Sequence, residues 1–129
     1  MSELRVLVGT KDYAGTVGFY RDVLGFPVHE VWDDPDGRGT LLRAADSALI
    51  EVIEDSPDHP ALAPHGVTVS IEVPDVDVRH RRLAEAGATI TEPLGDRPWG
   101  HRAVGFRDPN GLDLVLFTVT AGDHGMWAA

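Results

Sequence analysis

Apolar and polar positions change their spacing at regular intervals along the chain. Residues 4–9 alternate, with an apolar side chain at every second position, and this predicts a strand with one apolar face. In residues 12–26 (DYAGTVGFYRDVLGF) apolar side chains instead recur at steps of four, three and four, which predicts one amphipathic helix. We expect Asp12 to cap this helix and Gly25 to end it in the left-handed conformation. Its apolar face is made of Tyr13, Val17, Tyr20 and Leu24.

Three further strands are predicted after this helix. They cover residues 28–32, 40–44 and 48–53, and the acidic run DDPDGRG at residues 33–39 is expected to be a loop. The first half of the chain is therefore predicted to fold as a βαβββ unit.

The second half repeats this order. Strands are predicted at residues 67–73, 89–94, 102–106 and 112–119, with a loop at 96–100. Between the first two, a helix is expected from a cap at Asp75 to Ala86, stopped by Gly87. Its expected inner face consists of Val76, Leu83 and either Ala84 or Ala86.

The repeat predicts an α+β fold of two modules. The expected units are residues 1–54 and 67–120, joined by a proline-rich linker at 55–66 and followed by a tail at 121–129. Each sheet would have one face under its helix and a second face that must find cover. If the sheets curl, these second faces would enclose a cavity.

Composition narrows the classes of partner. The 129 residues carry 21 acidic and 11 basic side chains, a formal net charge of −10, and no basic stripe that could bind nucleic acid. The acidity favours a cationic small molecule, although a surface charged only for solubility is the simpler alternative. With no cysteine, no apparent signal peptide and no segment as long as a membrane span, we expect a cytoplasmic protein without disulfides or thiolate metal sites.

Several runs together resemble the vicinal oxygen chelate superfamily of glyoxalases, bleomycin resistance proteins and extradiol dioxygenases. They are TKDYAGTVGFYRDVLGF, ALIEVIE, IEVPDVD, RPWGHR and FRDPNGLDLVLF. The resemblance implies two βαβββ modules with curled sheets, paired in a homodimer that encloses two ligand cavities. It does not specify an activity, because this fold carries both enzymes and binding proteins.

Enzymes of this superfamily hold a divalent metal with one residue from the first and last strands of each module. Carried over to this chain, the four positions are Arg5, Glu51, Thr68 and Val115. A metal needs three or four converging nitrogen or oxygen donors, whereas Arg5 is always cationic and Val115 has no donor. We therefore expect no metal and no other cofactor, with Arg5 and Glu51 forming an ion pair instead.

Strand alternation places further residues on the same faces as these four positions. Two tryptophans at strand ends, Trp32 and Trp99, could stack on a planar or cationic ligand or could pack at a dimer seam. His101 lies near a strand that could face the cavity, whereas His59 and His65 fall in the linker, where a solvated side chain is expected. The predicted ligand-binding set is Arg5, Leu7, Trp32, Leu49, Glu51, Thr68, Ser70, Trp99, His101, Asp113, Val115 and Phe117, with no catalytic residue.

These features favour a metal-independent binding protein over an enzyme. It would sequester a drug-like natural product of the bleomycin, mitomycin or enediyne type and so confer resistance. The alternative is a lyase, isomerase or dioxygenase of the same superfamily that uses Glu51 as a general base or a rebuilt metal site.

Overall fold

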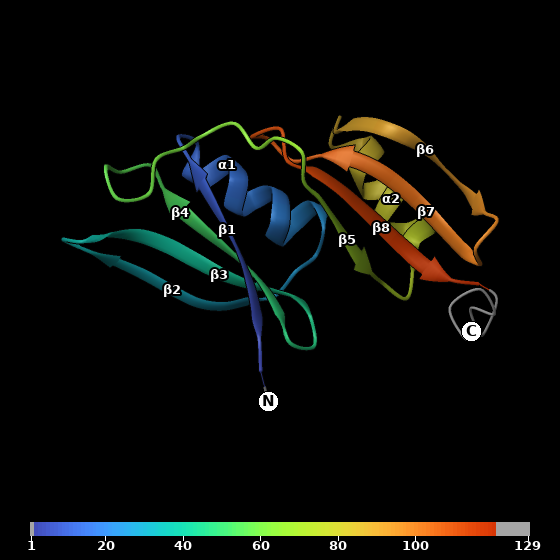
Figure 1. Cartoon of the computed structure of the whole chain (residues 1–129), viewed down its shortest axis with the longest axis horizontal. Coiled ribbons are helices and arrows are strands. Elements are labelled where there is room, and N and C mark those ends of the chain that lie inside the picture. The colour runs from blue at the N-terminus through green and yellow to red at the C-terminus, as the bar shows by residue number, and fades with distance from the viewer. Residues whose placement is uncertain (1, 121–129) are drawn as a thin grey trace.

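The computed structural model describes residues 2–120, which form two four-stranded sheets with helices along one face of each (Figure 1). The first sheet has the strand order β1-β4-β3-β2, and the second has the order β5-β8-β7-β6. The predicted α+β fold of two βαβββ modules is confirmed, while the predicted tail at residues 121–129 lies outside the described residues. The strands of the first sheet are β1 (Leu4–Thr10), β2 (Val28–Asp34), β3 (Gly37–Ala45) and β4 (Ala48–Glu54). Those of the second are β5 (Thr68–Glu72), β6 (Thr89–Arg97), β7 (His101–Arg107) and β8 (Asp113–Val119).

In each sheet the first strand pairs in parallel with the last one, and the other pairs are antiparallel. The alternation along the strands separates a helix-covered face from a face without a helix, as predicted. The side chains under the helices are buried and belong to one hydrophobic cluster that draws on both modules. From the parallel strand pairs, this cluster takes Val8, Ile50, Val52, Ile71, Leu114 and Leu116.

The first helix differs from the regular α-helix that the spacing predicts. It begins as α1 (Tyr13–Gly18) and continues as the π-helix η1 (Phe19–Val23), in which the Leu24 amide bonds to the Phe19 carbonyl at 3.0 Å. Gly25 then takes a φ of 76°, as expected of the helix stop. A guanidinium N–H of Arg79, from α2 (Val76–Glu85), donates to the Leu24 carbonyl, so a contact from the other module satisfies the end of this helix.

The acidic run at residues 33–39 is not the long loop that we expected. Strand β2 continues to Asp34 and β3 already begins at Gly37, leaving Pro35 and Asp36 as a tight turn. Pairing of β2 with β3 extends to Asp34 opposite Gly37, because a two-residue turn brings flanking residues into ladder register whatever their polarity.

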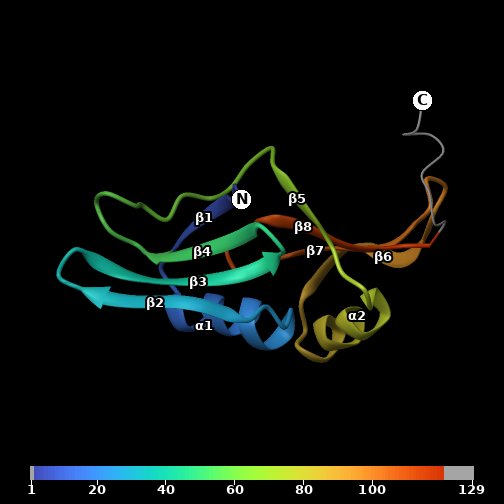
Figure 2. The same cartoon turned by 90° about the horizontal axis from the view of Figure 1, so that it is seen from below.

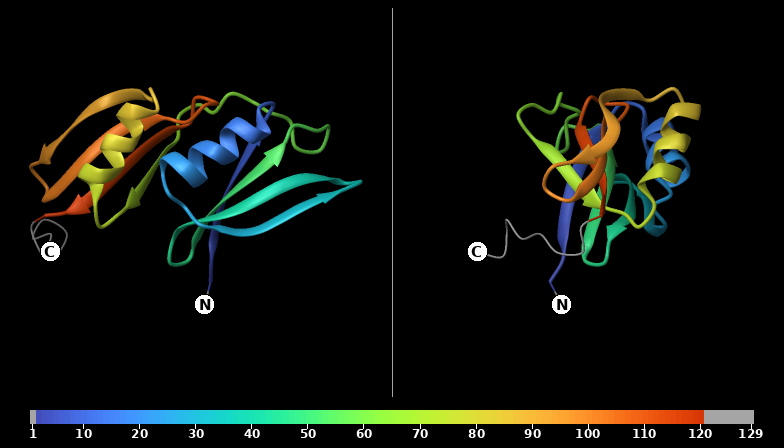
Figure 3. Two further views of the ribbon diagram at one scale, coloured as in Figure 1. Left: turned by 180° about the vertical axis from the view of Figure 1, so that it is seen from behind. Right: turned by 90° about the vertical axis from the view of Figure 1, so that its right-hand side faces the viewer.

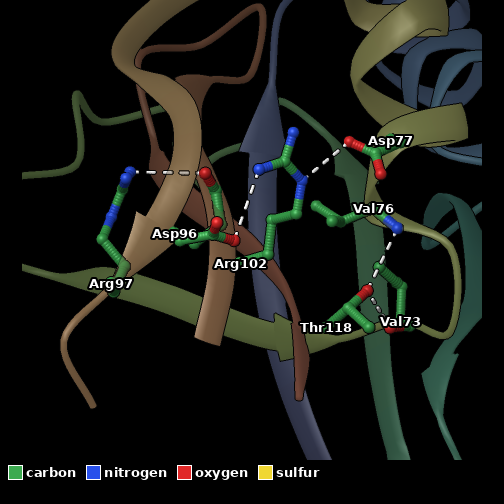
Figure 4. A network of polar contacts seen from close by, with 8 residues as sticks. Val73, Val76, Asp77, Asp96, Arg97, Arg102 and Thr118 are labelled. Atoms are coloured by element: carbon green, nitrogen blue, oxygen red, sulfur yellow. Dashed lines mark hydrogen bonds and ion pairs between the residues drawn. The ribbon is translucent and has the colours of Figure 1, made fainter. Parts of the chain in front are cut away.

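The side-chain acceptor at the start of α2 comes from the second sheet and not from Asp75 (Figure 4). The Val76 amide donates to the Thr118 hydroxyl at 3.1 Å, whereas the Asp75 carboxylate accepts from Arg79 at 3.0 Å. Arg102 adds ion pairs to Asp77 of the helix at 2.9 Å and to Asp96 of β6 at 3.3 Å. Asp75 thus occupies the N-cap position as predicted, but its side chain makes no capping bond, because a hydroxyl distant in sequence supplies the acceptor.

The inner face of α2 is narrower than predicted. Val76 and Leu83 are buried as expected, but Ala84 and Ala86 are both exposed.

No helix among residues 2–120 is long and apolar enough to cross a membrane.

Both helices lie on the same side of the molecule (Figure 2), and the view from behind shows them next to each other (Figure 3). The two modules therefore share one core through their helices, while the opposite face of each sheet has no helix over it. Those opposite faces carry most of the residues predicted to bind a ligand.

Candidate functional site

An ion pair sits on the uncovered face of the first sheet. Arg5 of β1 donates to the Glu51 carboxylate of β4 at 3.0 Å and to Glu3 at 2.7 Å, and these two bonds, led by the one to Glu3, raise the pKa of Arg5. The Glu51 side chain is only 13% exposed, while that of Arg5 is 42% exposed. The predicted Arg5–Glu51 ion pair is confirmed, and it spans two neighbouring parallel strands.

The four positions that the resemblance assigns to the metal ligands do not carry side chains that fit a metal. The guanidinium of Arg5 is cationic and already engages Glu51, and Val115 offers no donor, which leaves only the Thr68 hydroxyl in addition to the paired carboxylate. Among residues 2–120 no group of three or more His, Asp or Glu side chains could hold a metal ion. The donor set of these positions thus favours an ion-paired surface over a chelate.

Beside Glu51 the first sheet is hollowed into a cavity of about 240 Å³. Trp32 forms one wall and lies against Gly39, where an added Cβ would come within 2.2 Å of the indole ring. The full lining is Trp32, Asp34, Asp36, Gly37, Arg38, Glu51, Ile53, Ser56 and His59.

Ser56 and His59 belong to the linker, and sequence reasoning missed them. The sequence places His59 in a proline-rich stretch without periodicity, and nothing there signals that the stretch folds back over β4. Asp34 and Asp36 were missed for a related reason, since we expected them in a loop. The hydrogen bonds of the folded linker bring Ser56 and His59 to the cavity, whereas the pairing of β2 with β3 places Asp34 and Asp36 there.

A row of aromatic rings marks the uncovered face of the second sheet. The Trp99 indole N–H donates to His101 Nδ1 at 3.2 Å, and the His101 ring stacks on Phe117 with a centroid distance of 4.2 Å and an angle of 11°. Trp99 is 39% exposed, and His101 and Phe117 are half-buried. We call these three residues the aromatic row. It presents ring surface of the kind that stacks on planar ligands.

The other predicted residues occupy the same faces with different exposure. Thr68 and Ser70 are exposed on β5, Val115 is half-buried on β8, and Asp113 forms a 3.0 Å ion pair with Arg107. On the first sheet Leu7 is 54% exposed, whereas Leu49 is 1% exposed and lies in the interior. Leu49 is therefore a packing residue beneath this face, while the more exposed residues are accessible to a ligand.

The structure thus gathers the predicted residues into two groups. One surrounds Glu51 and Trp32 on the first sheet, and the other surrounds the aromatic row on the second. The cavity of about 240 Å³ takes its lining from the first module and the linker. Five of the twelve predicted residues belong to the first sheet, and seven lie on or beside the second.

With this fold and these faces described, the chain can be placed among known proteins. The family model of the Glyoxalase/Bleomycin resistance protein/Dioxygenase superfamily matches residues 4–116. The chain belongs to this superfamily, as the resemblance implied.

Curated relatives come from mycobacteria. An uncharacterized protein of Mycobacterium bovis is 31% identical over 111 residues, which cover 78% of this chain and 72% of the relative. A similar protein of Mycobacterium tuberculosis is also 31% identical over 111 residues, and these span 64% of its length. This chain therefore covers about two thirds of these relatives.

Solved structures with the same fold include proteins of different kinds. TioX from Micromonospora sp. ML1 has a TM-score of 0.74 at 24% identity, covering 92% of this chain and 99% of that one. TnmS3, an antibiotic binding protein from Streptomyces sp. CB03234, has a TM-score of 0.73 at 22% identity, covering 93% and 97%. Lactoylglutathione lyase from Agrobacterium tumefaciens has a TM-score of 0.65 at 17% identity, covering 91% and 92%. At these identities the likeness concerns the fold, which serves binding and catalysis alike.

Proposed function

We propose that the protein binds a drug-like natural product without a metal and, by sequestering it, confers resistance to it. The ligand would belong to the bleomycin, mitomycin or enediyne type of antibiotic, which places the chain in the antibiotic-binding branch of its superfamily. The observation that carries the proposal is the Arg5–Glu51 ion pair at two positions where the superfamily's enzymes hold a metal.

The ion pair bears on function through its charge. A guanidinium cannot lose its proton in a protein and repels a divalent cation, so the carboxylate beside it is held by Arg5 rather than offered to a metal. The same pair engages the carboxylate that an enzyme of this fold would use as a general base. The pair therefore opposes the use of Glu51 as a general base or as a ligand of a rebuilt metal site.

The aromatic row supports the binding part of the proposal. Trp99, His101 and Phe117 supply ring surface on one sheet, and Trp32 supplies another indole on the other sheet. Aromatic stacking combined with a few polar groups suits a large amphiphilic ligand. The TnmS3 structure supports the proposal at the level of the fold, since an antibiotic binding protein uses the same architecture.

We further propose that the chain acts as a homodimer, with modules paired between subunits. The predicted residues are divided between the two sheets, and a second copy could bring a first-sheet face opposite a second-sheet face. Exposed apolar side chains near the β1 and β5 edges, Leu4, Leu7 and Val67, are 63%, 54% and 58% exposed and would gain cover in such a dimer.

The test is a titration of the purified protein with bleomycin, mitomycin C and an enediyne, followed by calorimetry, before and after treatment with a chelator. We expect one of the three to bind, with an affinity that changes less than twofold after metal removal. Trp99→Ala should weaken this binding by about fivefold or more, since aromatic contacts contribute on the order of 1 kcal/mol.

Val31→Ala is the matched control, because Val31 is an exposed apolar residue outside the predicted set. Binding that disappears with the metal would overturn metal independence. Chemical conversion of the ligand during a long incubation with stoichiometric protein would favour the enzyme alternative instead.

A further inference from the structure

The first part of the linker is an ordered turn and not a free connection. The amide of Asp55 donates to the Thr10 carbonyl at 2.8 Å, and the Ala61 amide donates to the Asp55 carboxylate at 2.6 Å. Between these points Ser56 and His59 exchange backbone hydrogen bonds of 3.2 and 3.1 Å, and the Ser56 hydroxyl also accepts from the His59 amide at 3.1 Å. Residues 55–61 are thereby fixed along the ends of β1 and β4.

A glycine on β1 makes this placement possible. The Pro60 carbonyl lies so close to Gly9 that an added Cβ would come within 2.9 Å of the carbonyl oxygen. Any side chain at position 9 would push the linker turn away from the strand, because the contact is with backbone and not with a flexible side chain. Gly9 and the turn therefore fit each other.

The turn places Ser56 and His59 in the lining of the cavity of about 240 Å³, together with Trp32, Glu51 and Ile53. We call this space the linker cavity. Indole and isoleucine form its apolar walls, while a hydroxyl, an imidazole, carboxylates and the side chain of Arg38 contribute its polar part. A cavity of this size with mixed walls admits one side group of a ligand rather than a whole large molecule.

The charges of the lining determine which kind of side group binds in the cavity. Glu51 is balanced by Arg5 at 3.0 Å, and Arg38, the one cation in the lining, is balanced by Glu54 at 2.6 Å. Asp34 and Asp36 have no ion pair with another side chain in the part of the chain that the structure describes, although Asp34 accepts from the Asp36 amide at 2.9 Å. The lining thus has surplus acceptors and surplus negative charge beside an indole, a combination that favours a protonated amine.

We propose that residues 55–60 form one wall of the ligand site and that the linker cavity takes a protonated amine carried on an apolar or aromatic body. This inference rests on the proposed function, because it treats the cavity as part of the same ligand site. It assigns ligand contact to His59 and Ser56, and it makes the linker a determinant of specificity.

A matched pair of small probes tests this without knowledge of the natural ligand. 1-Naphthylmethylamine is cationic at neutral pH, and 1-naphthylmethanol has nearly the same shape without the charge. With 5-fluorotryptophan incorporated, the 19F resonance of Trp32 can be assigned by its loss in Trp32→Phe and then followed during titration. We expect the amine to shift this resonance and to bind at least tenfold more tightly than the alcohol at low salt.

Three variants and one control, His65→Ala, locate the effect. His59→Ala should weaken the amine at least fivefold, while His65→Ala, which changes a linker histidine that lines a different cavity, should leave it unchanged. Asp34→Asn keeps the acceptor for the Asp36 amide and removes only the charge, so it should reduce the preference for the amine over the alcohol. Gly9→Ala should weaken both probes together by displacing the turn.

The inference is wrong if amine and alcohol bind equally, if neither shifts the Trp32 resonance, or if His59→Ala behaves as His65→Ala does. The proposed function is judged separately, by the antibiotic titration and Trp99→Ala. Antibiotic binding that survives every linker variant would leave sequestration standing and overturn only the role of the linker.

Discussion

The hydroxyl of Tyr20 donates a 2.7 Å hydrogen bond to the carboxylate of Asp108, 88 positions later in the chain. Tyr20 is 0% exposed and Asp108 is 4% exposed. The same carboxylate accepts from the amides of Asn110 and Leu112 at 2.8 and 2.9 Å, which shapes the DPNG turn before β8. One buried group therefore fixes the turn of the second module and attaches it to the helix of the first.

A second contact of this turn reinforces the connection. The Asn110 side chain accepts from Thr10 at 2.8 Å and donates to Thr16 at 3.0 Å, so strand β1 and helix α1 both bind the turn. Two of the runs that carry the family resemblance, TKDYAGTVGFYRDVLGF and FRDPNGLDLVLF, are in contact through Tyr20 and Asp108. They are parts of one structural feature, the joint between the modules.

Removal of the Tyr20 hydroxyl should destabilise the whole chain and not one module. Tyr20→Phe takes one partner from a buried carboxylate, and we expect a loss of about 1–3 kcal/mol in the free energy of unfolding, measured by urea denaturation. Asp108→Ala should cost more, because it also removes the acceptor for two turn amides. In a double-mutant cycle the two changes should be strongly non-additive, and additivity within 0.3 kcal/mol, roughly the limit for independent sites, would contradict the coupling.

The buried tyrosine also predicts how stability changes at alkaline pH. Burial first, and the charge of Asp108 second, raise the pKa of Tyr20 well above the ordinary value of 10.0. A raised pKa in the folded state contributes stability that is complete below the unfolded pKa and lost as pH rises above it. The free energy of unfolding should therefore fall above about pH 10, by up to roughly 1.4 kcal/mol per pH unit from this group.

Tyr20→Phe isolates this contribution. Denaturation curves at several pH values between about 9 and 11.5 should show a shallower decline for Tyr20→Phe than for the wild type. Tyr13→Phe is the control for the loss of a tyrosine hydroxyl elsewhere on the same helix. Equal slopes for the wild type and Tyr20→Phe would show that Tyr20 does not govern alkaline unfolding.

Gly39→Ala should displace Trp32 from its position over the first sheet. An added Cβ would lie 2.2 to 2.9 Å from three ring atoms of the indole, so the ring must move. We expect a shift in tryptophan emission and at least a fivefold loss in affinity for the antibiotic that binds. Gly18→Ala makes the same chemical change in the first helix, where the nearest atom would lie 3.8 Å away, and should leave both readouts unchanged.

Charge reversal of the ion pair should show whether its attraction matters. Arg5→Glu leaves Glu51 beside a like charge, and we expect a small loss in the free energy of unfolding, because the pair is partly exposed and solvent screens its attraction. Arg5→Glu with Glu51→Arg should recover part of that loss. An unchanged free energy of unfolding in Arg5→Glu, or a double variant no more stable than Arg5→Glu alone, would show that the attraction of the pair does not contribute to stability.

The candidate site shows where prediction from sequence stops. The faces of the strands could be predicted, because alternation fixes the face of each residue once one position is known. The linker cavity could not, because its Ser56 and His59 reach the sheet only through hydrogen bonds to Thr10 and within the turn, and through the missing side chain of Gly9. The cap of α2 by Thr118 was missed for the same reason, since its acceptor comes from a strand 42 positions away.

By itself, the sequence determined the order of the strands and helices, the sides of each sheet and the helix stop at Gly25. These features follow from the spacing of neighbouring residues and from backbone preferences, which act within a few positions. The tertiary structure decided what joins those elements: Tyr20 with Asp108, Arg79 with the end of the first helix, and the linker with Trp32. Such contacts depend on which distant groups find each other once the apolar faces are buried, and no local pattern encodes that choice.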